Sequence, residues 1–214
     1  ERDKTERMSA SQLKKYQTSL DEIEKKIIYK PRTKELLPGM QEKKYSDNSK
    51  YVGELSSTMQ RQGKGIYYYA EGDVYAGEWQ ENTLQGYGIY LFSNGEKYEG
   101  EVQKGVKSGK GEYIYSNNNR YVGDWLNDRK HGFGTYYYHE KGDVYEGSFI
   151  DGSKEGHGRY TFANGDYFEG NFHRGERSGE GTIVYSSGTT LNGSFLNGEI
   201  SGEAKIRYYN NDAS

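Results

Sequence analysis

The chain has 214 residues, a net charge of -3 and no cysteine, which excludes disulfides, thiolate nucleophiles and cysteine-based metal sites. Its 30 glycines and 23 tyrosines accompany a hydrophobic content of only 32%, so aromatic side chains must supply most of the buried surface, and their abundance argues against a disordered chain. Residues 51–214 hold more acidic than basic residues, and no apolar run approaches the roughly 18–20 residues that span a bilayer, which argues against a nucleic-acid-binding surface and a transmembrane helix.

Residues 9–28 are predicted to form a helix. Apolar side chains recur there at steps of three and four residues, a heptad-like stripe made of Leu13, Tyr16, Leu20, Ile23 and Ile27. Ser9 or Ser11 is suited to cap the start, and Pro31 is expected to end the helix. The stripe fits two roles equally well, covering the exposed end of a sheet or docking onto a partner helix. We expect a helix and linker over residues 1–44 and a second domain over residues 45–214.

Residues 51–209 contain a repeat of about 23 residues. An aromatic-x-Gly-x-hydrophobic unit such as Tyr75-Ala76-Gly77-Glu78-Trp79 occurs seven times, with its glycine at steps of 23 or 24 residues. A Gly-x-Gly unit such as Gly86-Tyr87-Gly88 lies between successive copies, and the last copy has Ala204 at its second glycine position. Two motifs that keep one period over seven copies indicate a tandem repeat.

Each repeat is expected to be a β-hairpin. Asn94-Gly95 and Asn164-Gly165 favour tight turns in which both residues have positive φ. Connections this short force neighbouring strands to be antiparallel. We therefore predict an all-β repeat fold, an elongated single-layer antiparallel meander of about fourteen strands, which sheet twist is expected to curl into a half-open groove.

The two faces of this sheet are predicted to differ. Because side chains alternate along a strand, Tyr75, Gly77 and Trp79 share one face, which we call the aromatic face. Each glycine there leaves bare backbone on which a neighbouring ring can lie. The opposite face carries residues such as Lys110 and Glu112 and is expected to be mixed and mostly polar.

The copy Tyr121-Val122-Gly123-Asp124-Trp125, followed by Gly132-Phe133-Gly134-Thr135-Tyr136, resembles the MORN repeat (membrane occupation and recognition nexus). The resemblance covers residues 51–209. It implies a rod-like sheet and a non-enzymatic scaffold or adaptor in cytoskeletal, ciliary or membrane-junction assemblies. The 24-residue copy containing Tyr136-Tyr137-Tyr138 is similar to copies in radial spoke head proteins of motile cilia, which implies a cytoplasmic, axonemal location.

Four positions depart from the family pattern. Leu55 and Val102 stand where a bulky aromatic residue is expected, and Leu191 and Ala204 depart in the last copy. Degenerate copies are expected at the ends of an array, where they face solvent or act as caps. Val102 lies inside the array and is predicted to widen the groove locally.

The aromatic face is predicted to bind a partner. Its rings hold the sheet together, but a one-layer sheet would leave one side of them uncovered, and a large aromatic strip normally marks an interaction surface. We expect the groove to hold a helix or extended segment of a protein partner, or a second copy of the chain. A peripheral membrane or phosphoinositide-binding adaptor is the alternative, suggested by the family name. The predicted groove residues are Tyr75, Trp79, Tyr90, Phe92, Tyr98, Tyr113, Tyr115, Tyr121, Trp125, Tyr136, Tyr138, Tyr145, Phe149, Tyr160, Phe162, Phe168 and Phe172.

Neither catalysis nor a cofactor is indicated. Every Gly-x-Gly opens a predicted strand instead of joining a strand to a helix, as a dinucleotide site requires. The histidines do not occupy matching repeat positions, so they are expected to be surface residues and not metal ligands; they are His131, His139, His157 and His173. Carboxylates recur along exposed faces with no predicted pocket to tune their pKa. We expect no enzymatic activity, no cofactor and no metal.

Overall fold

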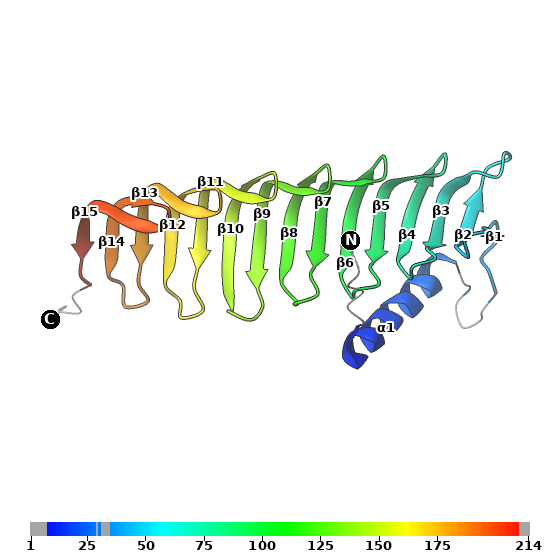
Figure 1. Cartoon of the computed structure of the whole chain (residues 1–214), viewed down its shortest axis with the longest axis horizontal. Coiled ribbons are helices and arrows are strands. Elements are labelled where there is room, and N and C mark those ends of the chain that lie inside the picture. Colours follow the sequence, from blue (N-terminus) through cyan, green and yellow to red (C-terminus); the bar gives the residue numbers. More distant parts are fainter. Residues whose placement is uncertain (1–7, 29, 31–34, 210–214) are drawn as a thin grey trace. The chain divides into compact units, whose positions relative to one another are not determined.

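The computed structural model describes residues 8–28, 30 and 35–209. By its internal contacts the chain divides into two compact units, residues 1–116 and residues 117–214. Each unit is a single-layer antiparallel meander of hairpins, as the repeat pattern predicts (Figure 1). Pro31, the predicted end of the helix, lies outside the described residues.

The first unit contains one helix and seven strands in its described part. These are α1 (Ala10–Ile27), β1 (Gln41–Lys44), β2 (Lys50–Leu55), β3 (Arg61–Tyr68), β4 (Val74–Gln80), β5 (Thr83–Leu91), β6 (Lys97–Gln103) and β7 (Val106–Ile114). The strands pair in chain order, each antiparallel to the next. The sheet begins earlier than predicted, because β1 pairs with β2 from Gln41 to Lys44, inside the segment expected to be a linker.

The second unit contains eight strands in its described part. These are β8 (Arg120–Leu126), β9 (Arg129–Tyr138), β10 (Asp143–Ile150), β11 (Ser153–Thr161), β12 (Tyr167–His173), β13 (Glu176–Val184), β14 (Thr190–Leu196) and β15 (Glu199–Arg207). They too pair in chain order and antiparallel.

Two kinds of turn join the strands. Lys104-Gly105 and Asp151-Gly152 have positive φ at both residues, 50° and 85° in the first and 48° and 89° in the second, the geometry of tight hairpin turns. The turn type predicted at Asn94-Gly95 is wrong, because only Gly95 has positive φ there. The Gly95 N–H donates to the Phe92 carbonyl at 2.9 Å, which is a type I turn followed by a left-handed glycine.

The alternation of tyrosine and glycine has the steric cause that the sequence predicts. The Tyr145 ring lies against Gly147 and Gly158, and a Cβ on Gly158 would sit 2.5 Å from the Tyr145 Oη. That hydroxyl donates to the Ser148 carbonyl at 3.0 Å. The same hydrogen bond, from a tyrosine to the carbonyl three residues on, recurs in four other copies, at Tyr51, Tyr75, Tyr98 and Tyr121.

The first glycine of each Gly-x-Gly has a different reason. Gly156 has a φ of 76°, a left-handed conformation that other residues adopt only at a cost. It lies beside the point where the register of β10 and β11 shifts, between Gly147 and Phe149. One glycine of the pair therefore serves the backbone, and the other makes room for a ring.

Helix α1 forms where it was predicted and packs against the opposite face of the first unit. Ser9 caps its start in a capping box with Gln12. Ile23, 6% exposed, and Ile28, fully buried, join a core cluster with residues of β2 to β5, namely Val52, Ile66, Val74, Ala76 and Leu91. The sequence left open whether the helix covers the end of the sheet or docks onto a partner helix, and in the structure it packs against one face of the sheet over β2 to β5.

Candidate partner-binding face

The aromatic face of each unit carries two rows of rings. The inner row lies over the glycines, and its rings meet edge to face. In the second unit the Tyr145 ring is 5.2 Å from Phe149 and 4.9 Å from Phe172, at interplanar angles of 89° and 81°. This arrangement suits aromatic quadrupoles and adds to the stability gained by burial.

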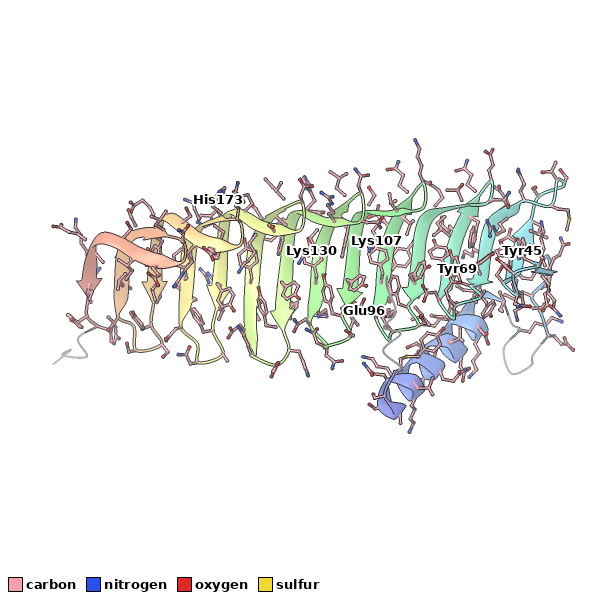
Figure 2. The ribbon with its side chains drawn as sticks, in the orientation of Figure 1. Tyr45, Tyr69, Glu96, Lys107, Lys130 and His173 are labelled. Atoms are coloured by element: carbon pink, nitrogen blue, oxygen red, sulfur yellow. The ribbon has the colours of Figure 1, made fainter. Side chains whose placement is uncertain are left out.

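The outer row, which we call the outer ladder, lies toward the ends of the hairpins that are farther from the inner row. Neighbouring rings lie 4.4 to 5.8 Å apart in the first unit and 4.6 to 5.7 Å apart in the second. Tyr45 and Tyr69 mark it in Figure 2. Its members are Tyr45, Tyr67, Tyr69, Tyr90, Phe92, Tyr113 and Tyr115 in the first unit, and Tyr136, Tyr138, Tyr160 and Phe162 in the second.

The predicted groove residues divide between buried and accessible positions. Ten of them are buried within the chain: Tyr75, Trp79, Tyr98, Tyr113, Tyr121, Trp125, Tyr145, Phe149, Phe168 and Phe172. The other seven are half-buried: Tyr90, Phe92, Tyr115, Tyr136, Tyr138, Tyr160 and Phe162. The expectation that a one-layer sheet leaves one side of the rings uncovered is therefore wrong for the ten buried residues, most of which belong to the inner row and cover one another.

Both tryptophans show why the inner row is inaccessible to a partner. Trp79 is 4% and Trp125 5% exposed, and the Trp79 Nε1–H donates to the Gly65 carbonyl at 3.2 Å. An indole bonded into its own sheet offers little surface to a partner. The accessible rings of the aromatic face belong mainly to the outer ladder.

The predicted helix stripe is largely used inside the first unit. Ile23 is buried, and three further members pack on the same cluster, Tyr16, Leu20 and Ile27. The Tyr16 Oη also donates to the Gly72 carbonyl at 2.7 Å. Leu13 remains 52% exposed, so it alone of the five is presented to solvent.

Carboxylate and amide side chains tie each repeat to the next beside the outer ladder. The buried Asp143 accepts from the Tyr160 hydroxyl at 2.7 Å and from the Ala163 N–H at 3.0 Å. Asn119 has the same role in the preceding copy, accepting from the His139 N–H at 2.8 Å. In the first unit Glu96 accepts from the Ser116 N–H (Figure 2). These hydrogen bonds between successive repeats hold the backbone beside the outer ladder in a fixed conformation.

Two ladder tyrosines of the second unit, Tyr138 and Tyr160, have a raised pKa. Burial raises the pKa of Tyr138 to about 12. Burial also raises the pKa of Tyr160, and its hydrogen bond to Asp143 acts in the same direction. At neutral pH these rings offer hydroxyl groups and π faces without negative charge.

The structure also places basic residues on the aromatic face, at positions that the sequence patterns did not identify as functional. In unit 2 the Lys154 Nζ lies 5.1 Å from the centre of the Tyr160 ring and 5.2 Å from that of Phe172. Equivalent residues are Arg61 and Lys107 in the first unit and Lys130 and Arg177 in the second. They recur at multiples of the repeat period, so the sequence contains a periodic basic position beside the periodic aromatic and glycine positions.

The family model for the MORN repeat matches residues 60–74, 75–97, 98–120, 121–141, 145–167, 168–190 and 192–213. The chain belongs to the MORN repeat family. The match starts at residue 60, whereas the repeat pattern starts at Tyr51. Tyr51 nevertheless packs on Gly53 and Gly65, as Tyr75, Tyr98, Tyr121 and Tyr145 pack on the glycines of later MORN copies.

Several solved structures match the chain with low sequence identity and TM-scores below 0.5. The TCP domain of Drosophila melanogaster SAS-4, in complex with a proline-rich motif of Ana2, is 16% identical over 85% of this chain and 97% of that chain, with a TM-score of 0.44. The G-box domain of the microcephaly protein CPAP is 12% identical over 80% of this chain and all of that one, with a TM-score of 0.43. No curated protein matches the sequence.

The described residues contain neither a metal-binding cluster nor a membrane-spanning helix. No group of three or more His, Cys, Asp or Glu side chains there is placed to hold a metal ion. His173, labelled in Figure 2, pairs instead with Glu155 at 2.8 Å. No helix in the described part of this MORN protein is long and apolar enough to cross a membrane.

Proposed function

We propose that this protein is a non-enzymatic scaffold that binds a segment of a protein partner along the outer ladder. We place it in a cytoskeletal assembly, with the radial spoke head of a ciliary axoneme as the specific candidate, on the resemblance of its 24-residue copy to radial spoke head repeats. The observation that carries the proposal is the outer ladder itself, a set of rings on a single-layer sheet that are half-buried at every position except the buried Tyr67 and Tyr113.

The contrast between the two faces of the first unit supports this choice of surface. Helix α1 fills the opposite face over β2 to β5, so that face already has its second layer. In the described residues the aromatic face has none. Half-buried aromatic rings held in fixed positions lose little entropy on binding, which is why tyrosine and tryptophan dominate binding hot spots.

Site-specific photo-crosslinking tests the surface. A benzophenone amino acid replaces Phe162 of the outer ladder in one variant, and Val122 on the opposite face of the same unit in the control. With ciliary or cytoskeletal extract, we expect the probe at 162 to capture a defined partner and the probe at 122 to capture none. Capture from residue 122 alone would contradict the proposal.

The membrane-adaptor alternative has a separate test. Sedimentation with vesicles of phosphatidylcholine, with and without phosphatidylserine or phosphoinositide, measures binding to lipid directly. We expect the chain to stay in the supernatant. Sedimentation that depends on the anionic lipid would favour the alternative.

A further inference from the structure

The second unit carries three cations in a line on its aromatic face. Lys130, Lys154 and Arg177 lie opposite Trp125, Phe149 and Phe172 in three successive hairpins. We call these three residues the cation row; Lys130, on β9, is labelled in Figure 2. The backbone of the row is fixed, because each of the three carbonyls accepts from the glycine N–H of the next tight turn, at Gly152, Gly175 and Gly198.

Aromatic rings surround each member of the row. The Lys130 Nζ lies 4.6 Å from the centre of the Tyr136 ring and 5.4 Å from that of Phe149. The Arg177 Cζ lies 5.2 Å from the Phe195 ring centre. In the described residues, none of the three cations has an ion pair.

Carboxylates pair with other basic residues of the same unit. Arg159, on the opposite face, binds Glu169 at 2.6 Å, and Arg129 lies 3.6 Å from Asp151. Asp143, a buried acid of the aromatic face, is already bonded to Tyr160 and Ala163. The three cations therefore form no ion pair within the described residues of a unit rich in acidic residues, although the Arg177 guanidinium donates to the Gly198 carbonyl.

The row is partly withdrawn from water. Burial lowers the pKa of Lys130 and of Lys154, which records the cost of holding an ammonium among rings. Cation–π attraction offsets part of that cost, and an anion would offset more. A cavity of about 220 Å³ lies between Lys154 and Arg177, with Tyr160, Phe162 and the exposed Glu176 in its wall.

The spacing of the row defines the ligand. Successive members are two strands apart, about 10 Å at the usual strand separation. Three residues of a polyproline II segment advance about 9.3 Å and bring the third side chain back to the same side. An extended segment in this conformation can therefore present one side chain to each repeat.

We propose that the cation row binds an extended acidic segment of a partner protein, with a carboxylate at every third residue, one for each repeat. This inference rests on the proposed use of the aromatic face for partner binding and adds the charge and spacing of the ligand.

Designed peptides provide the probe. The full chain is titrated separately with three peptides. The first has three Glu-Pro-Pro units, whose carboxylates are spaced like the repeats. The second has the same residues rearranged so that the three glutamates are adjacent, and the third has three Gln-Pro-Pro units. We expect the spaced glutamate peptide to bind about tenfold more tightly than either control, since charge-assisted hydrogen bonds are the strong ones. Calorimetry or fluorescence anisotropy measures the three affinities.

Substitutions identify the residues. Lys154→Met keeps the aliphatic chain over the rings and removes the charge, and we expect it to weaken the glutamate peptide about tenfold while circular dichroism stays unchanged. Lys205→Met removes the same charge from an exposed position on the opposite face of the unit, and should leave the affinity unaltered. Lys154→Glu should reject the glutamate peptide and gain affinity for Lys-Pro-Pro units.

The results separate this inference from the proposed function. If the glutamine peptide binds as well as the glutamate peptide, the aromatic face binds peptides but the cation row does not select them, and the inference fails alone. Failure of the spaced peptide to bind the unmodified chain also overturns the inference, while the crosslinking result stands on its own. Binding to phosphatidylserine vesicles that Lys154→Met abolishes, without peptide binding, would assign the row to a membrane.

Discussion

At the scale of single residues, the central tyrosine and the second glycine of a repeat form one packing unit. Gly158 has no unusual φ, so its only requirement is room for the Tyr145 ring. The last copy shows the alternative solution, because Leu191 replaces the tyrosine and Ala204 replaces the glycine, with the Ala204 Cβ only 3.2 Å from where a Cβ on Gly193 would lie. The departures seen in the sequence are thus a matched pair.

Gly158→Ala is expected to destabilise the chain by about 2–3 kcal/mol, as overpacking of a tight site commonly does. In the background of Tyr145→Leu the same substitution should cost clearly less, since the ring that it strikes is gone. Urea unfolding of the four proteins of this cycle measures the coupling. Equal costs of Gly158→Ala in both backgrounds would contradict the pairing.

Asp143 provides a second test at this scale. Asp143→Ala leaves the Tyr160 hydroxyl and the Ala163 N–H without their acceptor, and we expect a loss of about 2–3 kcal/mol. Asp143→Asn should be nearly neutral, because Asn119 binds the equivalent groups in the preceding copy. Thermal unfolding ranks the variants, and an Asn variant as unstable as the Ala variant would show that the charge is what matters.

At the scale of elements, α1 is part of the first unit and not an appendage. Its buried stripe completes a core to which the sheet contributes branched side chains such as Val52 and Ile66. The opposite face of the first unit is therefore apolar where the helix lies, although the sequence predicted a mostly polar surface there.

Two substitutions in α1 should differ sharply. Ile23→Ala removes buried methyl groups, and we expect a loss of about 2–4 kcal/mol. Leu13→Ala lies in the same predicted stripe but at an exposed position, so its effect should stay within about 0.5 kcal/mol. Denaturant unfolding of each variant decides. Similar small losses for both would mean that the helix contributes little to the fold.

At the scale of the whole molecule, tyrosine supplies most of the aromatic packing. We therefore expect the stability of the fold to decrease at alkaline pH, where tyrosine ionises. Burial raises the pKa of tyrosines in both units, such as Tyr75 and Tyr145. Such groups remain protonated in the folded state when the unfolded chain has begun to ionise, so their stabilisation is complete below about pH 10 and is lost as pH rises toward the folded pKa.

We therefore expect stability to be nearly flat from neutral pH to about pH 10 and to fall steeply above it. For Tyr138 the loss should extend to about pH 12. Lys130 and Lys154 act in the opposite direction, because their deprotonation as pH rises removes the cost of burying a charged ammonium group. Their effect is small because the tyrosines are far more numerous. Unfolding curves and phenolate absorbance against pH test this, and Tyr138→Phe should make the fall less steep. Free ionisation of the tyrosines at pH 10 without unfolding would disprove it.

The sequence by itself determined the repeat, the hairpins, the helix and the pairing of rings with glycines. These depend on local rules, the alternation of side chains along a strand and the steric needs of glycine, which a period of 23 or 24 residues displays seven times over. The candidate face could be chosen for the same reason.

Only the tertiary structure decided which rings remain accessible and what α1 covers. Burial of a ring depends on neighbours one hairpin away, as when Tyr145 meets Phe172 at 4.9 Å, and no single repeat contains that information. The apolar stripe of α1 could have met a partner as readily as its own sheet, and Ile23 is buried because β2 to β5 place apolar side chains beneath it. The cation row became significant for the same reason, since a lysine in the sequence shows neither the rings around its ammonium nor that it forms no ion pair within the described residues.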